Sequence, residues 1–134
     1  MATRAAIIME VEGKDHSYEG VYLHYDGYPE HAGQILTEHY NTLAKVEELI
    51  SHGGISVLGE VIGEKIDCSI PVPDNQCTFY HRDRGEEINI KKMEWLHEID
   101  QFTDNSSAEF TYLFTDGEWL IHIPATYIKL INHV

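Results

Sequence analysis

The chain has 134 residues, 43% of them hydrophobic, and carries 23 Asp and Glu against only 9 Lys and Arg. This length and composition predict a single compact domain spanning residues 1–134. The formal net charge of −14 disfavours direct binding to DNA, RNA or an anionic membrane surface, because each of these is itself a polyanion. No apolar run approaches the roughly 18 residues that a membrane span needs. We expect the apolar start of the chain to be a strand rather than a signal peptide, and the protein to be cytoplasmic.

The first half of the chain predicts a strand pair followed by two helices. Residues 5–11 and 20–26 have the composition of strands, and the polar segment between them favours antiparallel pairing. A proline and a glutamate at the start of residues 29–40 are typical of a first helical turn, so a helix is expected there. Asn41 or Thr42 then caps a second helix, which ends at a histidine followed by two glycines.

The middle of the chain is less regular. Glycines and prolines over residues 55–76 predict a long connection, with one short helix or strand near residues 57–62. A third strand is expected over residues 77–80, and the charged block that follows, residues 81–87, belongs to a loop or strand end. Cys68 and Cys77 leave two alternatives open, a disulfide or two reduced thiols, of which the second is typical of cytosolic proteins.

The last third predicts a helix and a hairpin. Apolar residues at helical spacing indicate a third helix over residues 90–102. Asp116 and Gly117 are a favoured pair for a tight turn, so residues 109–115 and 118–123 are expected to form a hairpin. The economical architecture is α+β, an antiparallel sheet of four or five strands with about three short helices packed on one face.

Acidic residues gather in two stretches without a single Lys or Arg, one between Lys14 and Lys45 and one between Lys92 and Lys129. Their mutual repulsion weakens the folded state, and a basic partner surface would relieve it. One hypothesis is a surface that imitates a polyanion and docks on a nucleic-acid-binding groove. The alternative is an ordinary acidic protein, or one adapted to salt. The surface would consist of Asp15, Glu19, Glu30, Glu38, Glu94, Glu98, Asp100, Asp104 and Glu109.

A histidine cluster is the first candidate for chemistry. His24 and Asp26 are two residues apart on a predicted strand and therefore point the same way, and His31 follows across a turn. Imidazole and carboxylate groups at this spacing suit a transition metal, or a general base oriented by the carboxylate. The alternative is that these side chains cap the helix expected after the turn. No Cys-x-x-Cys or His-Glu-x-x-His pair completes a metal site, and no cofactor is expected.

The charged block is the second candidate. It holds Arg82 and Arg84, two of the three arginines in the protein, beside Asp83 and Glu86. The planar guanidinium can clamp an anion in two places, with a carboxyl group as acid or base. The alternative is an internal ion-pair network that neutralises part of the acidic surplus.

Several segments resemble a family of short proteins encoded by bacteriophages and by bacterial genomes. The similarity covers most of residues 5–120, although the family usually has glycine where this chain has His81. It rests on Tyr22-Leu23-His24-Tyr25-Asp26-Gly27-Tyr28-Pro29-Glu30-His31-Ala32-Gly33, His39-Tyr40-Asn41, Arg82-Asp83-Arg84-Gly85-Glu86, Tyr112-Leu113-Phe114, Asp116-Gly117 and Trp119. The resemblance implies an accessory protein of a phage or mobile element acting in a host cell. Small acidic proteins of this kind often bind and block host enzymes or defence complexes.

Three functions therefore stay open. The leading hypothesis is a non-enzymatic inhibitor that docks its acidic surface, as a DNA mimic, on the basic surface of a host or defence protein. The second is the binding or hydrolysis of a small anionic ligand, by an enzyme or by a protein that sequesters a signalling metabolite. Its pocket would form if the second and third strands are neighbours, from His24, Asp26, His31, Arg82, Asp83, Arg84 and Glu86. The third is an interaction module whose charge is incidental.

Overall fold

One central strand organises the fold in the computed structural model, which describes residues 3–11, 17–63, 75–94, 96–123 and 126–129. This strand, β1 (Ala5–Glu10), pairs antiparallel with β2 (Tyr18–Tyr25) and parallel with β6 (Phe110–Thr115). Every β1 side chain up to Met9 is buried. Since successive side chains of a strand point to opposite faces, both faces of the sheet must be covered at β1.

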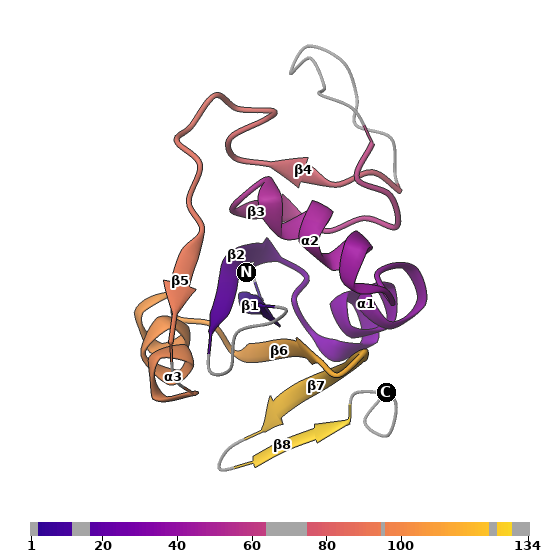
Figure 1. The fold of residues 1–134 in the computed structure, drawn as a ribbon. Coiled ribbons are helices and arrows are strands. Elements are labelled where there is room, and N and C mark those ends of the chain that lie inside the picture. The colour runs from indigo at the N-terminus through magenta and orange to yellow at the C-terminus, as the bar shows by residue number, and fades with distance from the viewer. Residues whose placement is uncertain (1–2, 12–16, 64–74, 95, 124–125, 130–134) are drawn as a thin grey trace.

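The sheet is mixed and larger than the sequence predicts. It has eight strands, in the order β4-β3-β2-β1-β6-β7-β8, and β5 also pairs with β2 (Figure 1). The pairs β1–β6 and β2–β3 are parallel. The prediction of four or five antiparallel strands is therefore wrong in number and direction, because these parallel pairs join segments that are distant in the sequence. The remaining strands are β3 (Ile55–Val57), β4 (Thr78–Phe79), β5 (Lys91–Met93), β7 (Glu118–Ile123) and β8 (Thr126–Lys129).

Helices cover both faces of the sheet, whereas the sequence predicted one. A π-helical turn, η1 (Pro29–Gly33), leads into α1 (Gln34–His39), and α2 (Leu43–Ser51) follows. Their apolar side chains join one core with Ile7, Val21 and Tyr112. On the other face α3 (Leu96–Asn105) places Ile99 in a second core with Ile8, Met93 and Leu113 (Figure 1). The second core exists because β1 is apolar on both sides.

Local sequence features explain most element ends. The predicted helix over residues 29–40 is confirmed as η1 followed by α1. Thr42 caps α2, its hydroxyl accepting a hydrogen bond from the Lys45 backbone N–H at 3.3 Å. The chain leaves α2 through Gly53, whose φ of 78° suits glycine. The predicted hairpin is confirmed as β6 and β7, with φ of 51° at Asp116 and 75° at Gly117.

The helix predicted over residues 90–102 is wrong at its start. Residues Lys91–Met93 form β5, and α3 begins only at Leu96. Tyr18 and Gly20 at the start of β2 offer an edge to which this segment pairs, and Met93 is buried opposite Tyr18. Tertiary pairing thus overrides the helical spacing. In the irregular connection the short element is β3, and residues 64–74 lie outside the described part of the chain.

Two buried side-chain hydrogen bonds tie the C-terminal hairpin to the first helices. The Tyr112 hydroxyl donates to the Gly27 carbonyl at 2.6 Å, and the Trp119 indole N–H donates to the Tyr40 carbonyl at 2.8 Å. Both carbonyls belong to turns between regular elements, so these bonds fix how η1 and α1 lie on the sheet. No helix in the described residues is long and apolar enough to cross a bilayer.

We predict that Tyr112→Phe lowers the free energy of unfolding by about 1–2 kcal/mol, because the buried Gly27 carbonyl loses its hydroxyl donor. Urea denaturation followed by circular dichroism measures the change. The control is Tyr25→Phe, at a side chain that is 44% exposed. Equal stability of wild type and Tyr112→Phe would show that the buried bond contributes nothing.

Candidate functional site

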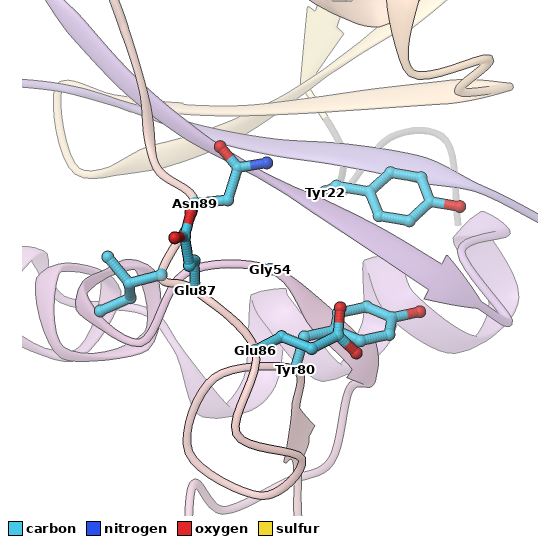
Figure 2. Close-up of a pocket in the computed structure, with 7 residues that line it drawn as sticks. Tyr22, Gly54, Tyr80, Glu86, Glu87 and Asn89 are labelled. Atoms are coloured by element: carbon cyan, nitrogen blue, oxygen red, sulfur yellow. The ribbon is translucent and has the colours of Figure 1, made fainter.

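A cavity with a partly polar lining lies on the sheet face that α3 covers. Tyr22 of β2 and Tyr80, just after β4, stand on opposite sides of it, and Asn89 and Glu87 lie at one end (Figure 2). Its volume is about 580 Å³. A smaller hollow of about 240 Å³ shares Tyr22 and Asn89 and extends to Phe102 of α3. The larger volume lies within the range of about 300–1,000 Å³ that is typical of small-molecule sites, and the smaller lies below it.

The sheet topology creates this cavity. β2 pairs with β5 through Tyr18–Gly20 and with β3 through Leu23 and Tyr25, so Tyr22 lies between two short strands. The chain from β4 to β5 passes over this gap. Its turn is closed by the Glu86 backbone N–H donating to the Tyr80 carbonyl at 3.0 Å. The His81 Nδ1 also lies 2.8 Å from the Glu86 carbonyl.

Arg84 and His24 contact the two tyrosines that border the cavity. The Arg84 guanidinium lies 5.2 Å from the centre of the Tyr80 ring and donates to the Ser56 hydroxyl at 3.3 Å. The Tyr22 hydroxyl and His24 Nδ1 are hydrogen-bonded at 2.6 Å. Burial raises the pKa of Tyr22, and the Arg4 guanidinium partly opposes this rise. The charged side chains that line the cavity itself are those of Glu86 and Glu87.

The groups that line the cavity can form hydrogen bonds and ring contacts with a ligand. Its lining combines two phenols, one amide and two carboxylates, from Tyr22, Tyr80, Asn89, Glu86 and Glu87. The described thiol, Cys77, is a free and fully buried cysteine that contacts the Tyr40 hydroxyl. Burial raises the pKa of the Cys77 thiol, which makes it a poor nucleophile. Cys68 lies outside the described residues, so the structure shows only that Cys77 is a free thiol.

Arg82 and Asp83 belong to the architecture rather than to the cavity. Arg82 Nε lies 3.0 Å from the Asp83 carboxylate, and the guanidinium also donates to the carbonyls of Ile62, Gly63 and Cys77. Asp83 in turn accepts from the Phe79 backbone N–H at 2.8 Å. The internal ion-pair alternative is confirmed for this pair, which ties the turn after β4 to the end of the irregular connection.

The histidine cluster is dispersed. His24 lies on the cavity face, Asp26 is an exposed residue with φ of 55° in the turn after β2, and His31 sits in η1 with its ring 6.0 Å from that of Tyr28. No side chain caps the start of η1. Among the described residues no three His, Cys, Asp or Glu side chains are placed to hold a metal ion. Of the seven residues predicted for one pocket, Glu86 lines the cavity, while His24 contacts Tyr22 and Arg84 contacts Tyr80.

Sequence reasoning missed the residues that shape the cavity. Tyr22, Tyr80 and Asn89 come from three separate segments and form no local motif. The sequence signal that could have identified Tyr22 was the alternation of β2, which places this residue on the face opposite Val21 and Leu23. Two tyrosines far apart in sequence cannot be paired without knowing that β3 and β5 both border β2.

Some residues of the predicted acidic surface contact or lie opposite other groups of the protein, and the others are exposed. Asp15 lies outside the described residues. Glu19 is opposite Lys92 in the β2–β5 register, Glu38 lies 3.9 Å from His39, and Glu98 accepts from the Glu94 backbone N–H. The other members are exposed and form no ion pair with Lys or Arg within the described residues; they are Glu30, Glu94, Asp100, Asp104 and Glu109.

Comparison of the chain with protein-family models, with curated proteins and with solved structures finds no match in any of the three. The resemblance to the phage family therefore stays a prediction, and function is argued from the structure itself.

We predict that Arg82→Ala lowers the free energy of unfolding by about 3 kcal/mol or more, because the buried Asp83 carboxylate loses its guanidinium partner. Arg84→Ala, at an exposed side chain, serves as the matched control and should change stability by less than about 1 kcal/mol. Chemical denaturation of both variants measures the difference. Similar losses in the two variants would contradict the structural role assigned to Arg82.

Proposed function

We propose that the protein is a non-enzymatic inhibitor that docks an acidic surface on the basic surface of a nucleic-acid-binding host or defence protein. The observation that carries this proposal is the charge pattern of α3. The exposed face of α3 carries Asp100 and Asp104, while Ile99 and Phe102 face the sheet. Within the described residues these two carboxylates have no Lys or Arg partner.

The placement of these charges is unfavourable for the helix itself. Asp100 and Asp104 are four residues apart, a spacing at which like charges repel by about 0.2–0.5 kcal/mol. Asp104 also lies in the last turn of α3, where no basic residue balances the negative end of the helix dipole. Glu98 differs, because it lies in the first turn and accepts the Glu94 N–H. Charges that oppose folding are expected where binding requires them.

A basic partner surface makes this arrangement favourable. Carboxylates that replace phosphates in a nucleic-acid-binding groove release the bound counterions and steer the encounter. The same net charge of −14 disfavours binding of nucleic acid by this chain itself. The resemblance to phage-encoded proteins supports the kind of partner, a host or defence protein. This transfer is by analogy of gene context.

We predict that Asp100→Asn with Asp104→Asn weakens binding to such a partner by about ten-fold or more and flattens its salt dependence. The partner is captured from nuclease-treated host lysate on the immobilised protein. Displacement of a labelled DNA duplex from that partner is then followed by fluorescence anisotropy. The same double substitution should stabilise the free protein by about 0.2–0.5 kcal/mol per relieved repulsion.

The control is Glu47→Gln with Glu48→Gln, which removes the same charge from exposed positions on α2, across the sheet. It should leave displacement of the duplex unchanged. The proposal fails if the captured partner does not compete with DNA, or if both double variants weaken binding equally.

A further inference from the structure

The turn that joins β2 to η1 and α1 carries an exposed patch separate from the acidic face of α3 (Figure 1). Tyr25 is 44% exposed and Tyr28 is 38% exposed, and within the described part of the chain they are two of the four large apolar side chains that are exposed. Asp26 and Glu30, in the same short segment, are exposed as well. We call these four residues the tyrosine turn. Aromatic and acidic side chains thus alternate on the surface over residues 25–30.

The backbone at the centre of this turn is held from two sides. The Gly27 backbone N–H donates to the Thr3 carbonyl at 2.8 Å, and the Gly27 carbonyl accepts from the Tyr112 hydroxyl at 2.6 Å. Gly27 also lies so close to β1 that a Cβ atom there would come within 2.7 Å of the Ala5 Cβ. The turn is therefore fixed to the start of β1 and to β6. A partner that binds it meets an ordered surface, which lowers the entropic cost of binding.

The backbone of Asp26 has a φ of 55°, in the left-handed region. Aspartate tolerates this conformation better than most residues with a side chain, but glycine adopts it without strain. Within the described part of the chain the Asp26 carboxylate forms no hydrogen bond or ion pair. Strained backbone of this kind concentrates at ligand-binding sites. The fold therefore accounts for the turn at this position but not for its carboxylate, whereas a contact with a partner accounts for both.

The charge of the tyrosine turn points to a cationic partner. Neither Asp26 nor Glu30 forms an ion pair with a Lys or Arg of the described residues. A cation that meets an exposed aromatic ring beside a carboxylate is attracted by both groups. Arginine suits this combination better than lysine, because the planar guanidinium stacks on an aromatic ring and also forms two parallel hydrogen bonds to a carboxylate.

We propose that the tyrosine turn binds arginine side chains of a basic protein segment, with guanidinium groups stacked on Tyr25 and Tyr28 and paired with Asp26 and Glu30. This inference rests on the proposed function only for the basic character of the partner. The acidic face of α3 attracts positive charge of either kind, whereas the tyrosine turn selects arginine over lysine. Tyrosine is also one of the residues that contribute most to binding energy at protein interfaces.

The test uses labelled oligoarginine and oligolysine peptides of equal length, titrated with the protein at low salt and followed by fluorescence anisotropy. The wild type should bind oligoarginine about five-fold tighter than oligolysine, because the two peptides carry the same charge and the guanidinium stacks better. Tyr25→Ala with Tyr28→Ala should reduce this preference to less than about two-fold. Tyr25→Phe with Tyr28→Phe should keep it, since stacking needs the ring and not the hydroxyl.

A second pair of variants tests the carboxylates. Asp26→Asn with Glu30→Gln should weaken the binding of oligoarginine by about five-fold. Asparagine tolerates a positive φ, so the turn keeps its shape. The matched control, Glu47→Gln with Glu48→Gln, removes the same charge from exposed positions on α2 and should weaken binding by less than about two-fold. Circular dichroism of each variant confirms that it is folded before titration.

The proposal is overturned if the wild type binds both peptides equally, if the double alanine variant keeps the preference for arginine, or if the two charge variants weaken binding equally. Light scattering gives the mass of the protein in solution. A dimer that dissociates in the double alanine variant would assign the tyrosine turn to a second copy of this chain and would also overturn the proposal.

The acidic face of α3 is separated from the tyrosine turn by the same assay. Asp100→Asn with Asp104→Asn should weaken both peptides by the same factor and leave the preference for arginine in place, and loss of that preference would contradict the assignment to the tyrosine turn. Because the peptides replace the natural partner, a failure of the protein to displace DNA from a captured partner leaves this result unchanged.

Discussion

Burial of β1 on both faces is the constraint from which the rest of the architecture follows. Ala5, Ile7 and Met9 face one core, and Ala6 and Ile8 face the other. A strand of this kind is stable only with a hydrogen-bonded neighbour on each edge and an apolar layer on each side. β2 and β6 supply the edges, and the two groups of helices supply the layers. The position of α3, and with it the exposed acidic face, is thus a consequence of β1.

The same arrangement leaves one polar gap. Beyond β2 the sheet continues through two short strands, β3 and β5, rather than one long strand. α3 covers the β5 end, where Met93 is buried, and not the β3 end, where Ser56 meets Arg84. Tyr22 stands at this boundary, so its ring borders a cavity instead of a core. At this boundary Arg84 lies against the Tyr80 ring and donates to the Ser56 hydroxyl.

The sequence was most informative where structure is local. Apolar residues of strand-like composition predicted β1, alternation and turn residues predicted β2 and the β6–β7 hairpin, and the Thr42 cap and Gly53 stop predicted α2. The run from Ala5 to Met9 has no polar alternation, which is itself typical of a strand buried on both faces, and the one-face prediction overlooked it. The parallel pairs, β5 and the cavity depend on contacts between distant segments, which no local pattern encodes. The sequence could not distinguish the role of Arg82 from that of Arg84, because only the fold places Arg82 against Asp83 and Arg84 against Tyr80.

We propose that the negative charge acts in binding at α3 and is not merely spread over the surface. Nuclear magnetic resonance of the ¹⁵N-labelled protein, titrated with a short oligolysine peptide at low salt, tests this directly. We expect the amide signals of Asp100 and Asp104 to shift first and furthest, while those of Glu47 and Glu48 on α2 stay in place. Equal shifts at all four residues would contradict it, since the peptide would then sense only the net charge.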